Sequence, residues 1–275
     1  MVNVRDIGGY PTRELYRQPH SSIRRGLIYR GGEPSRITPE GRTAFEALGI
    51  KKVYDIRTIN EIGTEKDDTI PMAALRQPIV DLEGAERIHL KVLAEDGAIR
   101  NKTESVKNWE KMGKNTTERF IAKTSEVLDN GSRLVPIFAH LAQPNPAPIY
   151  LHCTAGKDRT GTVIMLLFRL AGVPKHIVAE EYALTDLGLQ EEAPKLVEAL
   201  LKAPNLGLDE DTVKQLVVAK KEYVLALCDV LDEQYGGAER YFKDVLKMSA
   251  ADVQAIKRAL VVGKRPIFGK ETNGA

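Results

Sequence analysis

The chain has 275 residues, of which 43% are hydrophobic, so it is long enough to bury a full hydrophobic core. Its net charge at pH 7 is only +2, which gives no overall electrostatic reason to expect a nucleic-acid partner. Two cysteines are too few for a disulfide framework and no run of eighteen apolar residues occurs, so neither a disulfide-rich module nor stable membrane insertion is expected.

The first 30 residues are locally basic, since six arginines stand against two acidic residues, a net charge of +4. This charge suits the steering of an anionic substrate, although an arginine-rich solvated surface is the ordinary alternative. No apolar stretch near Met1 is long enough for a conventional signal peptide. With the low cysteine content this makes the cytoplasm the expected compartment, while export without such a signal stays open.

Short apolar runs alternate with helical patterns through the first part of the chain, which predicts an α/β fold. Thr38 and Pro39 predict the start of a first helix that ends at Gly49. Strands are expected in the apolar runs at residues 27–29, 52–56, 75–80 and 149–152. Further helices are predicted at 117–128 and 133–142, and the polar residues 83–114 should form a loop or a short helical insertion.

A segment with the sequence His-Cys-Thr-Ala-Gly-Lys-Asp-Arg-Thr-Gly-Thr runs from His152 to Thr162. It follows a short apolar strand and leads into a helix of apolar periodicity that Gly172 ends. Backbone N–H groups at such a helix start, together with the helix dipole, can hold a tetrahedral oxyanion without a metal or any other cofactor. Gly156 lets the backbone turn tightly and approach a ligand closely.

Cys153 stands at the start of this segment, where the helix dipole, Lys157 and Arg159 favour the thiolate over the thiol. Arg159 can offer two parallel N–H bonds to a phosphoryl group, and Thr160 is placed to hydrogen-bond the sulfur. We therefore predict a phosphate-ester hydrolase with Cys153 as its nucleophile, against the alternative of an ordinary buried cysteine. The predicted phosphate-binding residues are Thr154, Ala155, Gly156, Lys157, Asp158 and Arg159, with His152 in support.

Other loops of similar sequence can be compared directly. A nucleotide-binding loop of the G-x-x-x-x-G-K-[ST] type would need glycine at Leu151 and a hydroxyl at Asp158. A thioredoxin-type centre would need a second cysteine at Gly156. Two alternatives stay open: a phosphate-binding module without turnover, and a rhodanese-like sulfurtransferase, which also carries its cysteine on a strand-to-helix loop.

The segment matches His-Cys-x-x-Gly-x-x-Arg-[ST]-Gly, the signature of protein tyrosine phosphatases. Its Ala-Gly-Lys-Asp-Arg variant resembles an atypical group of that family with mycobacterial, other bacterial and fungal members. Residues 3–10, 27–32 and 53–58, followed by Glu61, are similar to the N-terminal segments of that group in order and spacing. The resemblance implies a central, mainly parallel sheet flanked by helices. It also implies a phosphocysteine intermediate and activity on phosphotyrosine, extending to phosphoserine, phosphothreonine and phosphoinositides.

The source of the general acid differs from that of common tyrosine phosphatases, which carry it on a Trp-Pro-Asp loop. The single tryptophan here, Trp109, is followed by glutamate and lysine. The resemblance assigns the acid role to Asp158. Lys157, Arg159 and the helix dipole would lower the pKa of this carboxyl, whereas a bound phosphate dianion and the thiolate would raise it. Asp81 is the second candidate, and a structural loop cap is the alternative role for Asp158.

Three further cations are candidate site residues. Lys157 adds a second positive charge beside Arg159, which suits inositol lipids with several phosphates, although it could equally tune the thiolate or face solvent. Arg5 and Arg57 stand in the segments that match the family. They are therefore better candidates for contact with the substrate than the other arginines near the N-terminus.

The chain after Tyr182 is almost wholly helical, with segments near 189–203, 209–235, 238–247 and 250–262, the last capped by Ser249. Cys228 falls on an apolar face and is expected in the core. The resemblance implies that a helical pair here forms a lid over the cleft, and a layer that completes the fold is the alternative. We expect one domain over 1–265, with its core at 1–184, the helical lid or layer at 185–262 and a flexible tail at 266–275. The oligomeric state stays open.

Overall fold

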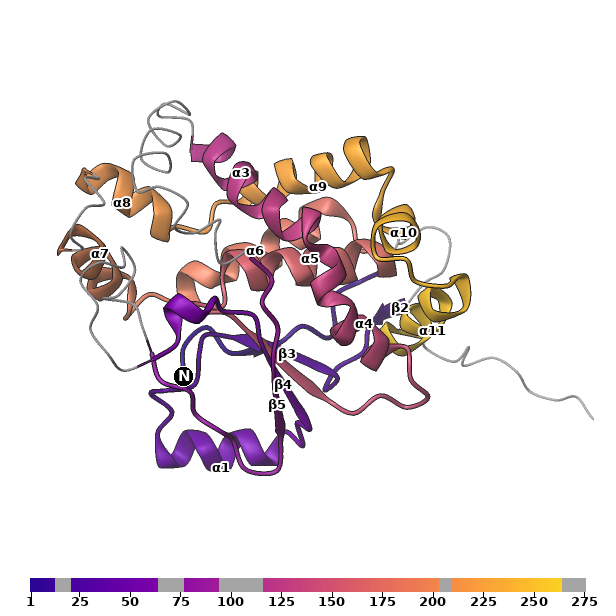
Figure 1. Ribbon diagram of the computed structural model, residues 1–275, viewed down its shortest axis with the longest axis horizontal. Helices are drawn as coiled ribbons and strands as arrows, with labels where there is room; N and C mark the ends of the chain where they lie inside the picture. The colour runs from indigo at the N-terminus through magenta and orange to yellow at the C-terminus, as the bar shows by residue number, and fades with distance from the viewer. Residues whose placement is uncertain (13–20, 64–76, 94–115, 203–208, 264–275) are drawn as a thin grey trace, which may run out of the picture.

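The computed structural model describes residues 1–12, 21–63, 77–93, 116–202 and 209–263 (Figure 1). Within these ranges, five strands form a sheet in the order β1–β3–β6–β4–β5, and two more form a small antiparallel pair. Neighbours among β3, β6, β4 and β5 run parallel, and β1 is antiparallel at one edge. The strands are β1 (Arg5–Asp6), β2 (Ser21–Ile23), β3 (Ile28–Gly31), β4 (Lys52–Asp55), β5 (Glu86–His89), β6 (Ile149–His152) and β7 (Val261–Gly263). This confirms the expected α/β fold with a mainly parallel sheet.

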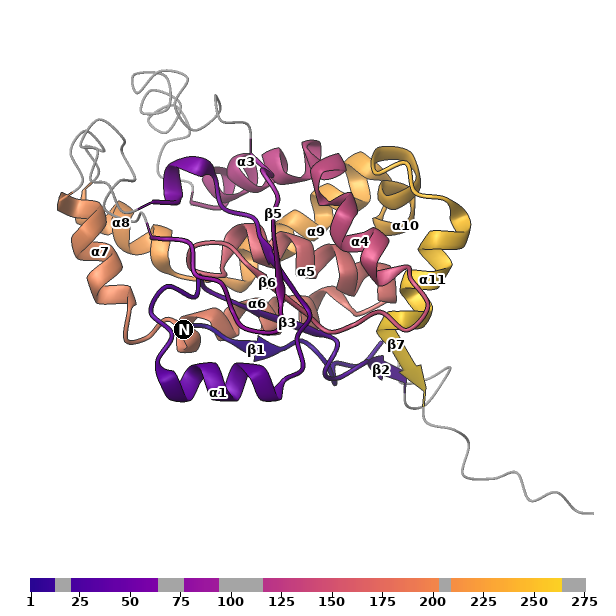
Figure 2. The same cartoon turned by 60° about the horizontal axis from the view of Figure 1, so that its bottom comes forward.

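Helices cover both faces of the sheet (Figures 1 and 2). Because successive residues of a strand point to opposite faces, Tyr150 packs against Phe45 of α1, whereas Ile149 and Leu151 enter the main core on the other face. The helices are α1 (Pro39–Ala47), α3 (Thr116–Asp129), α4 (Val135–Leu141), α5 (Asp158–Ala171), α6 (Lys175–Gly188), α7 (Ala193–Lys202), α8 (Glu210–Val217), α9 (Lys221–Tyr235), α10 (Ala238–Arg240) and α11 (Ala250–Leu260). The α1 start is as predicted, with the Thr38 side chain accepting from the Gly41 N–H.

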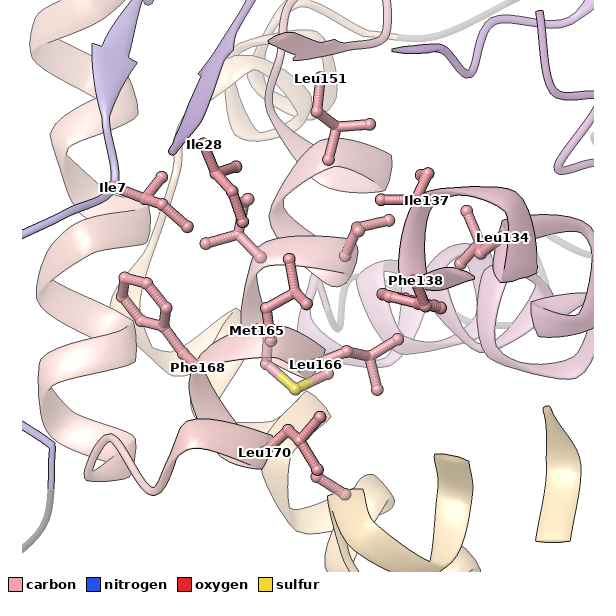
Figure 3. Packing of buried hydrophobic residues seen from close by; sticks show 14 of the residues in the cluster. Ile7, Ile28, Leu134, Ile137, Phe138, Leu151, Met165, Leu166, Phe168 and Leu170 are labelled. Atoms are coloured by element: carbon pink, nitrogen blue, oxygen red, sulfur yellow. The ribbon is translucent and has the colours of Figure 1, made fainter. Parts of the chain in front are cut away.

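The α5 helix is the centre of the main core, and Figure 3 shows its side chains packed between the sheet and α4. Met165 and Leu166 are fully buried or nearly so, and Phe168 lies near Ile7 in the same cluster. A helix that is buried on nearly every side cannot move without breaking core contacts. The predicted stop is confirmed, because Gly172 adopts a left-handed conformation with φ of 86°. The connection between β6 and α5 therefore joins a central strand of the sheet to a helix that is fixed in the core.

The C-terminal helices divide into two groups. The helices α9 and α11 join the main core, with Leu227 and Cys228 of α9 fully buried, which confirms the expected core position of Cys228. The α7–α8 pair instead packs on itself around Leu200, Val213 and Val217, and it lies at one end of the molecule in Figure 1. The α9 and α11 helices complete the main core, and for the α7–α8 pair both the lid and the layer stay predictions.

Some element predictions were wrong. The strand predicted at 75–80 is not formed in its described part, where Ile79 is 48% exposed. The edge strand is β5, inside the region 83–114 that was expected to hold a loop or helix. The β5 strand is held by backbone pairing with β4, and its sequence Glu-Arg-Ile-His has too few apolar residues to predict a strand.

Three helical predictions differ in detail. The helix at 133–142 begins with a 3₁₀ turn, Gly131–Leu134. The segment 209–235 divides into α8 and α9, and 238–247 consists of α10 and a π-helical turn, Tyr241–Val245.

Some predictions lie outside the described residues, namely the tail, Trp109 and most of the 83–114 insertion. Among the described helices, none has the length and apolar character needed to cross a membrane.

Candidate active site

The connection between β6 and α5, here called the β6–α5 loop (residues 153–158), lies at the carboxyl end of the parallel strands. Its carbonyl oxygens accept hydrogen bonds from groups on its outer side. These are Glu33 N–H to Thr154 at 3.0 Å, Asn3 Nδ2 to Ala155 and Gly156 at 3.0 and 3.1 Å, and Arg30 Nη2 to Gly156 and Lys157 at 2.6 and 3.3 Å. In a trans peptide the N–H points opposite to the C=O. The amides of residues 155–158 therefore face the inner side of the loop, where they can bind an anion.

Gly156 is required at its position for two reasons. Its φ is 66°, a left-handed conformation that glycine adopts without strain. A Cβ added there would lie 2.1 Å from the Gly31 carbonyl oxygen at the end of β3, which is far inside contact distance. The close approach of β3 fixes the curvature of the loop.

Cys153 is 3% exposed at the base of this loop, with His152 beside it. The buried His152 ring stacks on Tyr150, and its Nδ1 donates to the Cys153 carbonyl oxygen at 3.0 Å. Burial lowers the pKa of His152, and the nearby Asp55 only partly opposes this, so the ring is neutral and fixes the backbone at the cysteine. The other thiol, Cys228, has its pKa raised to about 12 by burial, which makes it unreactive.

Arg159 lies at the other end of the loop, in the first turn of α5, with its guanidinium held by Glu61. Its Nη1 and Nη2 donate to the two carboxylate oxygens of Glu61 at 2.6 and 2.5 Å, and Nη1 also reaches the Ile56 carbonyl at 3.3 Å. A guanidinium has five N–H donors. The Nε–H and the second Nη2–H have no acceptor among the described residues, and they share one edge of the group. This edge can bind two phosphoryl oxygens in parallel.

Glu61 anchors that arginine, although it is not among the site residues predicted from the sequence. Its carboxylate also accepts from the Thr154 hydroxyl at 2.6 Å and from the Thr58 N–H and hydroxyl at 2.9 and 2.8 Å. Burial alone would raise the pKa of Glu61, but the charge and hydrogen bonds of Arg159 hold it far below its usual range. The Thr-x-x-Glu spacing of residues 58–61 was the signal available in the sequence, since it is a capping box.

Asp158 is held by three donors. Lys123 of α3 contacts one carboxylate oxygen at 2.8 Å, while Lys157 and the Tyr182 hydroxyl contact the other at 2.8 and 3.0 Å. Burial would raise the pKa of Asp158, but the two lysine charges and their hydrogen bonds lower it well below its usual range. The carboxyl is therefore ionised in this structure, and the pKa of Lys123 is raised in return by the Asp158 charge. Lys123 and Tyr182 were not found from the sequence.

Lys157 is buried, in contrast to the alternative in which it faces solvent. Its ammonium group contacts Asp158 and lies 3.3 Å from the Val218 carbonyl just after α8. A pocket beside the loop is lined from four parts of the chain, by Phe120 and Lys123 of α3, Lys157 and Asp158, Gln215 of α8 and Tyr223 of α9. The second cation of the loop thus faces this pocket.

Thr160 does not make the hydrogen bond that the sequence predicted. Its side chain is fully buried, and its hydroxyl has no partner among the described residues, so it does not contact the Cys153 sulfur. A buried hydroxyl without a partner costs free energy. This donor is therefore available to a group that gains negative charge during the reaction.

The remaining candidates lie away from the inner side of the loop. Arg57 donates from Nε and Nη2 to Asp55 at 3.0 and 2.7 Å, and Arg5 pairs with Glu181 at 2.7 Å, so both guanidinium groups are held in internal ion pairs. Asp81 is exposed, and its carbonyl oxygen accepts from Arg42 of α1 at 3.4 Å. The structure therefore brings none of the three together with Cys153 and Arg159. Of the other N-terminal arginines, those at 13 and 17 lie outside the described residues.

The fold and the loop together define a cysteine-dependent phosphatase. Residues 1–262 match the sequence model of the tyrosine phosphatase family, and the chain belongs to that family. It is 24% identical over 285 aligned positions to the triple specificity protein phosphatase PtpB of Mycobacterium tuberculosis. This alignment covers 94% of this chain and 96% of PtpB. It is 26% identical over 242 positions to a tyrosine-protein phosphatase of Nostoc commune, covering 86% and 75% of the two chains. The predicted hydrolase class is confirmed, and the binding-module and sulfurtransferase alternatives gain no support.

Proposed function

We propose that Cys153 is the nucleophile that hydrolyses phosphotyrosine, with the inward amides of the β6–α5 loop and the free edge of Arg159 binding the phosphoryl group. The observation that carries this proposal is the orientation of the loop. Its carbonyls are bound on the outer side, so its amides converge on the space above a buried cysteine. Because these donors are fixed by the fold, they need no reorganisation when negative charge develops.

The first step is transfer of the phosphoryl group to sulfur. The Cys153 thiolate donates an electron pair to phosphorus, an S–P bond forms, and the P–O bond to the tyrosine oxygen breaks. The leaving phenolate takes one proton. Arg159 and the loop amides stabilise the charge on the equatorial oxygens, and Glu61 keeps the guanidinium edge aligned with them.

The second step is hydrolysis of the phosphocysteine. Water attacks phosphorus and passes a proton to the Asp158 carboxylate left by the first step, and the S–P bond breaks to return the thiolate and release inorganic phosphate. We propose that the Thr160 hydroxyl, which has no partner among the described residues, rotates in this step and donates to the sulfur as negative charge returns there. Cys153 must be a reduced thiol for each cycle, which agrees with the proposed cytoplasmic location.

We assign the proton of the first step to Asp158. A bound phosphoryl dianion adds negative charge beside the carboxylate and competes for the ammonium groups of Lys157 and Lys123. Both effects raise the pKa of Asp158 from the low value that the lysines impose. Asp158 then becomes a proton donor only when substrate is present.

Replacing Asp158 by asparagine should therefore slow the substrates with poor leaving groups most. We expect turnover of alkyl phosphates to fall about 10²- to 10³-fold, because alkoxides need protonation. Turnover of p-nitrophenyl phosphate, whose phenolate leaves readily, should fall less than about tenfold. Asp81→Asn, a substitution at an exposed site, should change neither rate. Equal losses on both substrate types would leave Asp158 with only a structural role.

For substrate range, we propose phosphotyrosine first, and phosphoserine, phosphothreonine and phosphoinositides in addition. Lys157 and Lys123 support the wider range, because they bring two cations to the pocket beside the loop, more than a single phosphate monoester requires. The description of the mycobacterial relative as triple specificity also favours it.

Turnover of three substrate classes by the purified protein tests this proposal. Phosphate release should be measured from a phosphotyrosine peptide, the same peptide with phosphoserine, and short-chain phosphoinositides. We expect hydrolysis of all three, fastest on phosphotyrosine, and no change with EDTA because the nucleophile and the phosphate-binding groups belong to the chain. No release from any of them would refute the proposed function, and release from phosphotyrosine alone would refute the wider range.

A further inference from the structure

Four buried or nearly buried polar side chains from distant parts of the sequence lie against the outer side of the β6–α5 loop. Asn3 and Arg5 come from the N-terminal segment, Arg30 from β3 and Glu181 from α6. None of them takes part in the chemical steps described above. Asn3 and Arg30 contact loop carbonyls, and Arg5 and Glu181 contact these two residues, which suggests another role.

Arg30 is fully buried behind the loop. Its Nη2 donates to the Gly156 carbonyl at 2.6 Å and to the Lys157 carbonyl at 3.3 Å, and its Nη1 pairs with Glu181 at 2.6 Å. Its Nε–H has no acceptor among the described residues. Burying a guanidinium with an unmet donor is costly, and this cost is offset only by the contacts of Arg30 with Glu181 and the loop carbonyls. The guanidinium therefore acts through the loop and Glu181 rather than through apolar packing.

Asn3 contacts the same loop. Its Nδ2 donates to the Ala155 and Gly156 carbonyls, while its Oδ1 accepts from Arg5. Arg5 also pairs with Glu181 at 2.7 Å. Because Arg5 occupies the amide oxygen, the amide nitrogen of Asn3 is directed at the loop. Asn3 has a φ of 56°, a left-handed conformation that asparagine and glycine tolerate best.

We propose that Asn3 and Arg30 are positioning residues that hold three peptide units of the loop with their N–H groups directed at the phosphoryl group. The peptide units are those that carry the amides of Gly156, Lys157 and Asp158. A hydrogen bond to a carbonyl oxygen also polarises its peptide and strengthens the N–H at the other end, most of all when the donor is a cation. Arg5 and Glu181 keep the two donors in place. The inference rests on the proposed function in one respect, that the bound anion is the phosphoryl group of the substrate.

Asn3→Gly tests the first donor, because glycine keeps the left-handed backbone and removes only the side-chain amide. We expect the Kd of inorganic phosphate, measured by calorimetry, to rise about tenfold, and kcat/KM on a phosphotyrosine peptide to fall by a similar factor. Asn145→Gly is the matched control, since Asn145 also has a positive φ of 51° but is exposed in the turn before β6. The control should bind phosphate as the wild type does.

Arg30→Met and Arg30→Lys test the second donor. Phosphate affinity should fall in the order wild type, Arg30→Lys, Arg30→Met, because lysine keeps the charge but cannot reach Glu181 and two carbonyls at once. Arg169→Met is the control. Arg169 also contacts a carboxylate, that of Asp232, and a carbonyl, that of Val173, but it lies at the far end of α5. Its loss should lower the melting temperature without changing phosphate affinity.

All affinities are to be compared at a temperature where circular dichroism shows each variant folded. If Arg30→Met does not fold, Asn3→Gly and Arg30→Lys decide the question. Wild-type phosphate affinity in Asn3→Gly and Arg30→Lys would overturn the inference, as would the absence of phosphate binding by the wild type. A wild type that binds phosphate without turnover would refute the proposed function alone, since the affinity comparison does not depend on hydrolysis.

Discussion

Cys153→Ser is expected to reduce phosphotyrosine turnover by at least about 10⁴-fold, because a serine hydroxyl at neutral pH is a far weaker nucleophile than a thiolate. The substitution replaces one atom in a buried site, so the fold should persist. The inward amides and the guanidinium edge of Arg159 are unchanged, so inorganic phosphate should still bind. Phosphate release assays and calorimetry on the same preparation measure the two properties.

The second cysteine provides the control for this experiment. Cys228 is fully buried in α9, and the cations that act on it are Arg169 and Lys175 rather than residues of the loop, so Cys228→Ser should affect stability rather than chemistry. Burying a hydroxyl in an apolar site should cost about 1–3 kcal/mol. We expect a lower Tm with kcat unchanged below it. Turnover by Cys153→Ser near the wild-type rate would disprove the cysteine mechanism.

Arg159→Lys should lower kcat by about 10²- to 10³-fold, because lysine cannot contact Glu61 and two phosphoryl oxygens at once. Glu61→Gln tests the same arrangement from its other side. The amide supplies one acceptor oxygen instead of two, and its NH₂ group faces the donors of Arg159, so alignment of the guanidinium should be lost. We expect a smaller but clear loss, about 10- to 100-fold in kcat/KM.

The control for this pair is Arg169→Lys, which disturbs an ion pair at the far end of α5 and should preserve turnover. Steady-state kinetics with a phosphotyrosine peptide measure all three variants. A Glu61→Gln enzyme with wild-type kcat/KM would show that the guanidinium needs no anchor. Full activity of Arg159→Lys would exclude the bidentate contact from the mechanism.

The parts of this molecule that the sequence predicts well are those with strong local signals. The β6 strand, the loop and α5 follow from an apolar run, a glycine turn and helical periodicity, and Gly172 ends the helix where expected. The first helix begins at its Thr38 cap for the same reason. These elements are determined by contacts between residues close in sequence, so their pattern is visible without knowledge of the fold.

The pairings that complete the site are long-range and leave no such pattern. Lys123 meets Asp158 across 35 positions, and on its amphipathic helix it resembles any solvated lysine. Arg57 illustrates the opposite error, since its place in a matched segment favoured a substrate contact, but Asp55 two residues earlier pairs with it. The sequence shows which charges are present, and the fold decides which of them neutralise one another.

The α7–α8 pair has a consequence for how this architecture can diversify. Its apolar contacts are largely internal, around Leu200, Val213 and Val217, while α8 lines the pocket next to Lys157. A change in its length or composition would therefore reshape the pocket beside Lys157 while the main core around α5 keeps its own contacts. Selection for new targets can act on these two helices while the buried residues of the main core stay as they are.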